Sequence, residues 1–183
     1  SPEEIFAICD QFGEVPTPPY VKASKEHSKQ YQTVYAKDIG SVAAPTAGFH
    51  FTQPLLDQLQ KKGVQLAFIT LHVGLGTFRP MKSETLEEHQ MHSEWISVSQ
   101  EVCEKIIETK KSGHRVVAVG TTATRALETA AKHATTSIIT PFEGFTNLFI
   151  TPGYSFNVID HLITNFHLPK STLLVLVSSL ASR

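Results

Sequence analysis

Hydrophobic residues recur along this chain in two spacings, and these predict alternating helices and strands. A helix is predicted after Thr52, a good N-cap, with leucines on one face and Gly63 at its end. The continuous apolar run 64–71 follows it and predicts a buried strand, and residues 95–98 predict a second, short strand. The spacing therefore changes from helical to extended at Gly63.

The middle of the chain repeats this change of spacing. Ser99 is expected to cap a helix that ends before Gly113, because apolar residues fall three and four positions apart between them. The valine-rich run 115–119 predicts a strand, and the turn 120–122 leads into a helix with small apolar residues on one side. These elements predict a strand–turn–helix unit.

Three further elements are predicted toward the C-terminal end. Strands are expected at 147–150 and 158–164, after a loop around Pro141 and Gly144. Pro169 marks the start of a last helix. Apolar residues surround that helix, so we expect it to be buried.

The alternation of strands and helices predicts an α/β fold with a mixed, largely parallel sheet and helices on both faces. A length of 183 residues suits one domain or one large lobe of a bigger protein. In such sheets ligands bind where the strands end, so the loops at the carboxyl ends form the candidate site. These loops are 49–51, 72–80, 120–124 and 165–170.

The first 40 residues differ from the rest in composition. Prolines between positions 16 and 19 disfavour helix and central strand, so we expect a Pro-, Lys- and Tyr-rich connecting segment over 1–40 and the α/β domain over 41–183. Lysines and tyrosines alternate in this segment, which suits a nucleic-acid patch or, more commonly, a solvated loop. The chain starts without Met and stops within a predicted helix, so we expect a piece of a longer protein.

Composition and charge narrow the class of protein. Lysine plus arginine number 16 against 17 aspartate plus glutamate, so no overall positive field indicates nucleic acid. Cys9 and Cys103 lie far apart and predict neither a disulfide framework nor a metal site. No apolar run approaches the roughly 20 residues of a membrane helix. We therefore expect a cytoplasmic globular protein without a membrane partner.

The stretch HVGLGTFRP is the first candidate site. Gly74 and Gly76 lack a Cβ, so the backbone is able to approach a flat ligand or to present N–H groups to an anion. A strand that ends in a tight turn explains the two glycines equally well. On the local sequence both interpretations stay open.

The stretch EEHQMHSEW places two histidines three residues apart beside several carboxylates. The metalloprotease order HExxH is absent, so a metal site is disfavoured. Acid–base or hydrogen-bonding roles for His89, His92 or Glu94 fit better, because histidine titrates near neutral pH and a neighbouring carboxylate selects its tautomer. A polar loop without a function is the alternative.

The stretch GTTATRALE follows a strand and opens a helix. The free N–H groups at Thr121 and Thr122 are able to bind a carboxylate or phosphate, although the two threonines also suit simple capping. Arg125 and Glu128 are one turn apart, and this spacing most often makes a helical ion pair.

The stretch TNFHLPKST repeats this arrangement with His167 and Lys170 at a helix start. A lysine is unfavourable beside the positive end of the helix dipole unless an anion is bound there, which favours a site. No GxSxG elbow and no Walker loop occurs in the sequence, so hydrolases and NTPases are disfavoured.

Six stretches carry a family resemblance when they are taken together: GSVAAPTAGFHFT, ITLHVGLGTFRP, EEHQMHSEW, VVAVGTTATRALE, FITPGYSF and LITNFHLPKSTLLVLVSSLASR. Their order and spacing resemble the S-adenosylmethionine:tRNA ribosyltransferase-isomerase family of queuosine biosynthesis, from about Gly13 to Arg183. Members of that family are longer, with an N-terminal part that includes a small β-barrel domain and with a C-terminal extension. The chain is thus similar to the latter part of the family's large domain. Its small departures are Phe145, Asn147 and Ser182, where Trp, Asp and Gly are usual.

The resemblance implies a transfer reaction. The ribosyl part of S-adenosylmethionine would be transferred and isomerised onto 7-aminomethyl-7-deazaguanine at the wobble position of a tRNA anticodon, giving epoxyqueuosine, adenine and methionine. It further implies tRNA and S-adenosylmethionine as partners, no metal, no cofactor beyond that co-substrate, and a monomer. Another α/β enzyme that uses a nucleotide or S-adenosylmethionine, or a non-catalytic tRNA-binding module, is the alternative.

The resemblance and the predicted loops together suggest site residues. Proton transfer is expected first of His50 and His72, and the further catalytic candidates are His92 and Glu94. The candidates for stacking, for lining a nucleoside and for holding an anion or hydroxyl group are Phe49, Phe51, Gly74, Gly76, Thr77, Phe78, Arg79, Thr121, Thr122, Arg125, Asn165, His167 and Lys170.

Overall fold

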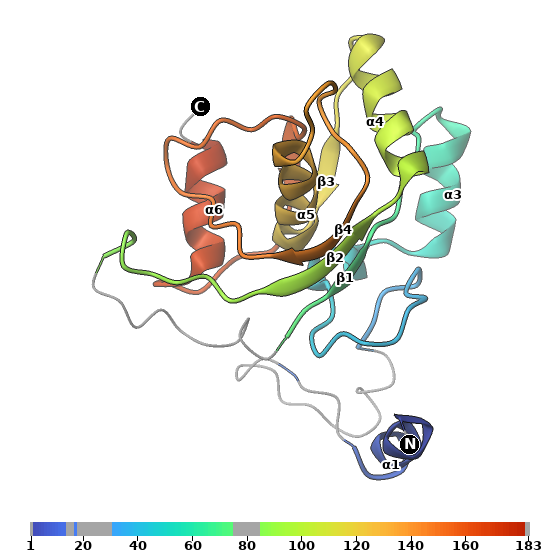
Figure 1. Cartoon of the computed structure of the whole chain (residues 1–183). Coiled ribbons are helices and arrows are strands. Elements are labelled where there is room, and N and C mark those ends of the chain that lie inside the picture. The colour runs from blue at the N-terminus through green and yellow to red at the C-terminus, as the bar shows by residue number, and fades with distance from the viewer. Residues whose placement is uncertain (1, 14–16, 18–30, 75–84, 182–183) are drawn as a thin grey trace.

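The computed structural model describes residues 2–13, 17, 31–74 and 85–181. The helical segments are α1 (Pro2–Phe12), the 3-10 turn η1 (Thr46–His50), α3 (Gln53–Lys61), α4 (Gln100–Lys111), α5 (Thr121–Lys132) and α6 (Thr172–Ala181) (Figure 1). The strands are β1 (Thr70–His72), β2 (Glu94–Val98), β3 (Val117–Val119), β4 (Phe142–Thr146) and β5 (His161–Ile163). Helix α1 was not predicted, and Glu3 and Glu4 suit its first turn because they face the positive end of the helix dipole.

The strands form two small sheets. One has the order β1-β2-β4 and is antiparallel throughout, and the other pairs β3 with β5 in parallel. The α/β class is confirmed, but the expectation of a largely parallel sheet is wrong for the three-stranded sheet. Alternating helices and strands imply parallel neighbours only when each crossover returns to the adjacent strand. Here α4, β3 and α5 all intervene before β4 pairs with β2.

Several helix boundaries agree with the sequence. The hydroxyl of Thr52 accepts from the N–H of Leu55 at 3.4 Å, and that of Ser99 accepts from Val102 at 3.4 Å. These side chains cap α3 and α4, because each satisfies an N–H group that the first turn leaves free. The predicted unit of β3, a turn and α5 is also present.

The predicted buried strand at 64–71 is wrong over most of its length. Only Thr70–His72 form β1, while Val64 and Phe68 have exposed fractions of 46% and 52%. The N–H of Val64 instead donates to Leu59 O at 3.0 Å, at the end of α3. An apolar run has no strand geometry by itself, because a strand needs a partner for its backbone.

The predicted strand at 147–150 is also wrong, and β4 occupies the place of the predicted loop around Gly144. Gly144 has φ of +153° and pairs with Ile96, so this glycine lies within the strand. After β4 the N–H of Leu148 donates to the Thr146 hydroxyl at 3.2 Å, and its carbonyl accepts from Arg125 Nε at 2.9 Å. Side chains therefore replace a neighbouring strand there.

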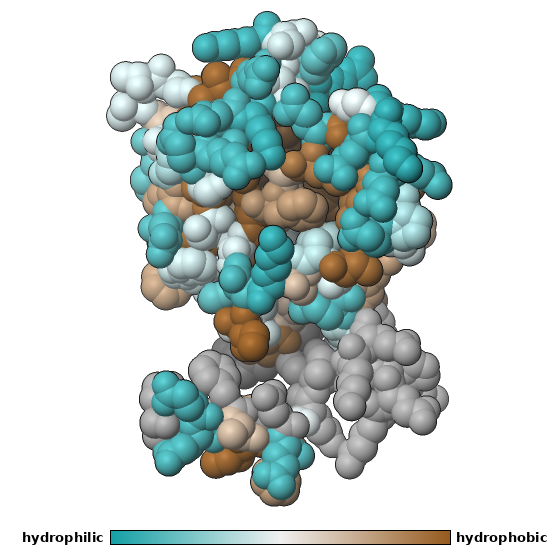
Figure 2. Space-filling model, turned by 90° about the vertical axis from the view of Figure 1, so that its right-hand side faces the viewer, coloured by the Kyte–Doolittle hydropathy of each residue, from teal (hydrophilic) through white to brown (hydrophobic). Residues whose placement is uncertain are grey.

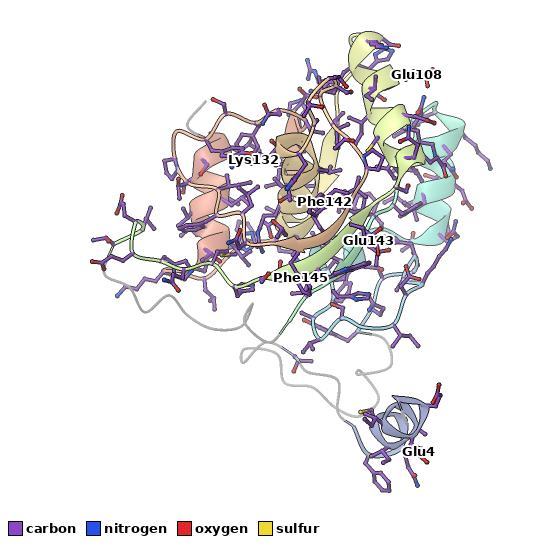
Figure 3. All side chains as sticks on the ribbon, viewed as in Figure 1. Glu4, Glu108, Lys132, Phe142, Glu143 and Phe145 are labelled. Carbon is purple, nitrogen blue, oxygen red and sulfur yellow. The ribbon has the colours of Figure 1, made fainter. Side chains whose placement is uncertain are left out.

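Helix α5 lies at the centre of the fold. It contacts β1, β2, β3, β4 and α6, and most of its residues are buried (Figure 1). The core around it consists of Ile96, Val98, Val102, Cys103, Ile106, Ala118, Ala126, Leu127, Ala130, Ala131, Ile139, Val158 and Ile159. On β4 the ring of Phe142 packs on this core, whereas Phe145 has an exposed fraction of 70% (Figure 3).

The outer surface is mostly polar on the face seen in Figure 2, with apolar side chains visible between the polar ones. Helix α6 was expected to be buried on all sides, and this is wrong. Leu176 and Ser179 are buried, but Leu174 has an exposed fraction of 40%. Its uniformly apolar sequence requires more packing partners than the described residues provide.

Candidate functional site

The carboxyl end of β1 is packed against the segment 38–42. The N–H of Val42 donates to Val73 O at 2.9 Å, and the N–H of Val73 donates to the Ser41 hydroxyl at 3.0 Å. A Cβ added to Gly40 would lie only 2.7 Å from the His72 ring. Glycine at position 40 is therefore required by the close approach of this imidazole.

His72 is held by aromatic packing. It lies opposite Trp95 in the β1–β2 register, and the two rings stack with centroids 4.9 Å apart and an interplanar angle of 30°. Its buried Nε2 has no hydrogen-bond partner among the residues that the structure describes. His72 thus lies at the end of a strand, as the sequence predicts, and stacking on Trp95 holds its ring.

His50 lies at the end of η1 and meets the loop that follows β5. Its Nε2 and Asn165 Oδ1 are 2.8 Å apart, and Asn165 Nδ2 donates to the Thr46 hydroxyl at 3.0 Å. A Cβ added to Gly120 would lie 4.0 Å from Ala47. The carboxyl ends of β3 and β5 therefore meet at η1, although 115 residues separate His50 from Asn165.

The N-terminus of α5 begins at this junction. Gly120 has φ of +96°, a conformation that glycine adopts without a steric cost, and its N–H donates to Ile163 O at 2.8 Å. Thr121 is buried and Thr122 is half-buried. Thr122 lines a pocket of about 330 Å³ whose wall also includes Tyr35, Asp38 and Thr70.

The wall of this pocket includes a buttressed carboxylate and an aromatic pair. The Thr70 hydroxyl donates to Asp38 Oδ2 at 2.8 Å. The rings of Tyr35 and Phe68 lie 5.1 Å apart, and burial raises the pKa of the Tyr35 hydroxyl, so it stays neutral. Together these groups offer a carboxylate and aromatic surface beside the start of α5, which suits a polar ligand with a flat ring.

A chain of charged side chains runs from α5 to the segment before β2. Arg125 Nη1 donates to Glu94 Oε2 at 2.5 Å, and Glu94 Oε1 lies 2.9 Å from His92 Nε2. The exposed fractions of the Arg125 and Glu94 side chains are 4% and 1%, while that of His92 is 26%. Burial lowers the pKa of Arg125, and the charge of Glu94 and its hydrogen bond oppose that shift. Only the histidine end reaches solvent.

This chain lies at the same edge of the antiparallel sheet as His72. Glu94 opens β2, and its neighbour Trp95 is the residue opposite His72 in the register. Because β1 and β2 run in opposite directions, the end of one and the start of the other share an edge. His72, His92 and Glu94 therefore come from one edge of the sheet.

The expected ion pair between Arg125 and Glu128 is wrong. Arg125 pairs with Glu94, and Glu128 accepts hydrogen bonds from the backbone N–H groups of Asn157, Val158 and Ile159 at 2.9, 2.9 and 3.2 Å. Partners from distant parts of the chain are favoured over the helical ion pair because both side chains are buried, and a buried charge needs close, well-oriented partners.

The remaining candidates lie in different environments. His167 Nε2 is 3.0 Å from the Thr164 hydroxyl, and burial lowers the pKa of this imidazole. Lys170 is exposed with φ of 58° just before α6, whose first turn Ser171 caps at Leu174 N–H. Phe49 meets Tyr31 edge to face at 5.0 Å.

Part of the first candidate loop has no described geometry. Phe51 and Gly74 are half-buried. Four candidates fall outside the described residues: Gly76, Thr77, Phe78 and Arg79. The role of this loop therefore stays a prediction.

Sequence reasoning missed Trp95, Asp38 and Thr46. Trp95 was predicted only as the first residue of a short strand, and its stacking on His72 depends on the register of two strands separated by a long connection. Asp38 and Thr46 contact residues more than 30 positions away. No local spacing in the sequence indicates such pairs.

In the part of the chain that the structure describes, no three His, Cys, Asp or Glu side chains gather closely enough to hold a metal ion. None of the described helices has the length and apolar character needed to cross a bilayer.

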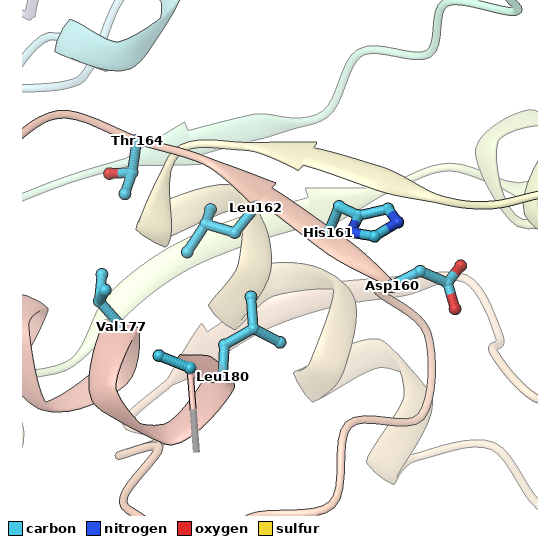
Figure 4. Close-up of a pocket in the computed structure, with 7 residues that line it drawn as sticks. Asp160, His161, Leu162, Thr164, Val177 and Leu180 are labelled. Carbon is cyan, nitrogen blue, oxygen red and sulfur yellow. The ribbon is translucent and has the colours of Figure 1, made fainter. Parts of the chain in front are cut away.

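A second hollow of about 350 Å³ lies between β5 and α6 (Figure 4). Leu162, Val177 and Leu180 make its wall apolar, and Asp160 and His161 lie at one end. The charge of Asp160 is balanced by Lys110, whose Nζ lies 2.7 Å from Asp160 Oδ1. This hollow differs from the pocket at α5, because its wall is dominated by aliphatic side chains.

The fold and these contacts define an α/β domain with a polar site at the carboxyl ends of its strands. A family model described as queuosine biosynthesis protein matches residues 2–183, and the chain belongs to this family. The resemblance drawn from the six stretches is thereby confirmed.

Named relatives agree with this assignment. The chain is 52% identical to the S-adenosylmethionine:tRNA ribosyltransferase-isomerases of Francisella philomiragia and Francisella tularensis subsp. novicida, over 99% of the chain and 53% of each relative. It is also similar to the crystal structure of S-adenosylmethionine tRNA ribosyltransferase from Thermotoga maritima, with a TM-score of 0.58 and 43% identity over 74% of this chain and 41% of that one. The chain thus spans about half the length of the curated relatives it matches.

Proposed function

We propose that this chain is part of the catalytic domain of an S-adenosylmethionine:tRNA ribosyltransferase-isomerase. The ribosyl part of S-adenosylmethionine is transferred and isomerised onto 7-aminomethyl-7-deazaguanine at the wobble position of a tRNA anticodon, which gives epoxyqueuosine, adenine and methionine. S-adenosylmethionine is a co-substrate used for its ribose. The observation that carries this proposal is the family match across residues 2–183.

The placement of the candidate histidines supports the proposal. The reaction needs a base that removes a proton made acidic by the adjacent sulfonium, and a donor that assists the departure of adenine. His72 lies at the end of β1, His92 just before β2, and His50 beside the loop after β5. His72 and His50 lie near carboxyl ends of strands, where ligands bind in α/β folds, and His92, at the amino end of β2, shares the sheet edge of His72 because β1 and β2 are antiparallel.

The helix starts provide candidates for anion binding. Thr121 and Thr122 open α5, and free N–H groups at a helix start attract a carboxylate or phosphate. Asn165, His167 and Lys170 occupy the segment between β5 and α6. Gly76, Thr77 and Arg79 of the first candidate loop are further candidates. In this proposal these residues bind the methionine carboxylate and the tRNA backbone.

Aromatic side chains are the candidates for base recognition. The wobble base must leave its stack before chemistry reaches it, and an extruded base is held by aromatic faces. Phe49 and Phe51 flank the candidate base His50, and Phe78 belongs to the loop after β1. The pocket beside Thr122 offers Tyr35 and Phe68 as further aromatic surface.

The proposal is tested with the full-length protein that contains this chain. It is incubated with tRNA carrying the queuosine precursor and with S-adenosylmethionine labelled in its ribose. We expect label to move onto the tRNA, with adenine and methionine released in equal amounts. Release of S-adenosylhomocysteine indicates a methyltransferase instead, and tRNA binding without consumption of S-adenosylmethionine indicates a non-catalytic module.

A matched pair of variants connects this activity to the site. His72→Asn is expected to lower the rate of label transfer at least tenfold, because it removes a titratable ring at the end of β1. His114→Asn changes an exposed histidine beyond the end of α4 and should leave the rate unchanged. Equal rates in both variants would remove His72 from the mechanism.

A further inference from the structure

The three candidate histidines differ in what holds them. His72 is stacked on Trp95, and within the described part of the chain its Nε2 has no hydrogen-bond partner. His50 bonds to the neutral side-chain amide of Asn165. Of the three, counting contacts with described residues, only His92 contacts a carboxylate, that of Glu94.

Glu94 is set up to stay ionised. Its side chain has an exposed fraction of 1%, and its Oε2 accepts from Arg125 Nη1 at 2.5 Å. An arginine stays protonated in proteins, so the buried carboxylate has a permanent counter-charge. Arg125 is itself anchored, because its Nε donates to Leu148 O at 2.9 Å from within α5.

An ionised Glu94 decides the tautomer of His92. A carboxylate accepts hydrogen bonds and donates none, so the 2.9 Å contact requires a proton on His92 Nε2. In the neutral ring the free lone pair is then on Nδ1, which accepts no hydrogen bond from the described residues. The His92 side chain has an exposed fraction of 26%, whereas those of Glu94 and Arg125 are buried, so the imidazole is the member of this chain that solvent reaches.

We infer that His92 is the general base of the reaction, acting through Nδ1, and that Glu94 and Arg125 are positioning residues that hold it. This inference rests on the proposed function and assigns Arg125, at first a candidate for substrate binding, to the support of Glu94. The C–H bond beside the sulfonium breaks, its proton moves to His92 Nδ1, and the electron pair remains on that carbon. The sulfonium stabilises that electron pair, and Glu94 stabilises the imidazolium.

A buried arginine–carboxylate pair suits this task for a physical reason. A proton that arrives on His92 creates a positive charge beside the negative charge of Glu94, in an interior where water does not screen the attraction. The carboxylate is already oriented by Arg125, so no reorganisation accompanies the transfer. A surface histidine without this support lacks both advantages.

The test uses the full-length protein with ribose-labelled S-adenosylmethionine and precursor tRNA. His92→Asn is expected to lower kcat at least 100-fold with little change in the KM for S-adenosylmethionine, because a general base contributes to the transition state. His114→Asn, on an exposed histidine, is the matched control and should keep the wild-type rate. A kcat for His92→Asn within threefold of wild type would overturn the assignment of the base.

The positioning role has a readout of its own. Glu94→Gln keeps the shape of the side chain and removes its charge, so kcat should fall about tenfold and the acidic limb of the pH–rate profile should move to lower pH. The shift arises because a neutral amide no longer favours the protonated ring. A lower rate with an unmoved acidic limb would show a structural role for Glu94 and would overturn this part of the inference.

Arg125→Lys tests the last member of the chain without removing its charge. The lysine keeps a counter-charge for Glu94 but lacks the planar guanidinium that bonds to Glu94 and to Leu148 O at the same time. We therefore expect an intermediate loss of rate, with the acidic limb of the pH–rate profile at its wild-type position. A pH limb that moves as in Glu94→Gln would contradict the assignment of Glu94 as the group next to the proton.

Failure of the proposed function is recognised separately. Nitrogen-15 NMR on the full-length protein reports the tautomer of His92 without any turnover, and we expect the proton on Nε2. If wild-type protein moves no label to tRNA while this tautomer is present, the proposed function fails and the base assignment fails with it. If label moves but the proton lies on Nδ1, only the base assignment is overturned.

Discussion

Two buried glutamates have opposite surroundings: Glu128 is part of α5, and Glu94, at the start of β2, pairs with Arg125 of that helix. Glu128 accepts from backbone N–H groups at both oxygens and from the Tyr154 hydroxyl at 3.2 Å, and its exposed fraction is 0%. Glu94 gives one oxygen to a buried arginine and the other to a histidine that reaches solvent. The carboxylate of Glu128 is thus surrounded by groups that hold the fold, whereas that of Glu94 contacts a side chain that is exposed to solvent.

The surroundings of Glu128 are those of a structural group. Burial, the charge of Glu128 and the hydrogen bond to it all raise the pKa of Tyr154, so its hydroxyl stays a donor across the physiological range. The N–H groups of Val158 and Ile159 bind one oxygen and fix the approach to β5. The difference teaches that burial alone does not mark a carboxylate as functional, because Glu128 is as buried as Glu94 and all its hydrogen bonds come from groups that fix the fold.

The largest effect should come from breaking the pair at Glu94. Arg125→Met leaves Glu94 as an uncompensated buried charge, and we expect the free energy of unfolding to fall by about 4 kcal/mol. Chemical denaturation of the full-length protein measures it. The double variant with Glu94→Met removes both charges and should recover most of the loss. A double variant as unstable as the single one would show that the charge is not the cause.

The next effect concerns Glu128. Glu128→Gln turns an amide N–H₂ toward backbone donors, so we expect unfolding to become easier by about 3 kcal/mol. The rate per folded molecule should stay at the wild-type value, the opposite of Glu94→Gln. Denaturation and single-turnover rates measured on the same samples separate the two. A change in the pH–rate profile of Glu128→Gln would end the distinction between the two glutamates.

Loss of a hydrogen bond between two neutral side chains should lower the free energy of unfolding by less. The hydroxyls of Thr129 and Thr146 are 2.6 Å apart in the core, and Thr146 also accepts from Leu148 N–H. Because the Thr129 hydroxyl donates to Arg125 O at 2.7 Å, Thr146 is the donor in this contact. Thr146→Val keeps the shape, removes this donor and leaves the Leu148 N–H without its acceptor, at about 1.5 kcal/mol. Urea denaturation measures the loss. Substitution of the exposed Thr135 by Val is the matched control and should be close to neutral.

The smallest effect is expected at a half-exposed ion pair. Lys110 Nζ donates to both oxygens of Asp160 at 2.7 Å, with exposed fractions of 26% and 32%. Burial acts to raise the pKa of Asp160, but hydrogen bonds from Lys110 and from Val116 N–H outweigh it, and the pKa lies below its ordinary value. Lys110→Met should therefore cost no more than about 1 kcal/mol at neutral pH.

The pH dependence of this pair has a definite sign. Because the folded pKa is depressed, the stabilisation is present above the ordinary aspartate value near 4 and is lost as the pH falls through the lowered value. Lys110→Met should flatten the stability curve in that acidic range, and Lys111→Met, on an exposed lysine, should not. Identical curves for the two variants would contradict this.

Much of the secondary structure could be predicted because its causes are local. Thr52 and Ser99 cap their helices through residues three positions away, and Gly63 and Gly113 supply positive φ at the ends. The strand at 147–150 failed because Leu148 bonds to side chains from α5 and β4. No property of its sequence distinguishes that run from a strand.

The candidate site divides in the same way. The EEHQMHSEW stretch indicated His92 and Glu94, because a histidine beside carboxylates suggests proton transfer whatever the fold. The tertiary structure decided which partner each charge takes. Arg125 does not pair with Glu128, one turn away, but with Glu94, 31 residues distant in the sequence. The Glu128 carboxylate accepts hydrogen bonds from backbone N–H groups instead.

By itself, the sequence determined the family, the boundaries of α3, α4 and α5 and the residue types able to move a proton, since these depend on composition and short spacings. Only the tertiary structure decided the antiparallel sheet, the stacking of His72 on Trp95 and the chain from Arg125 to His92. The reason is physical: pairing energies in the interior depend on which distant groups become buried together, and short spacings carry no record of that.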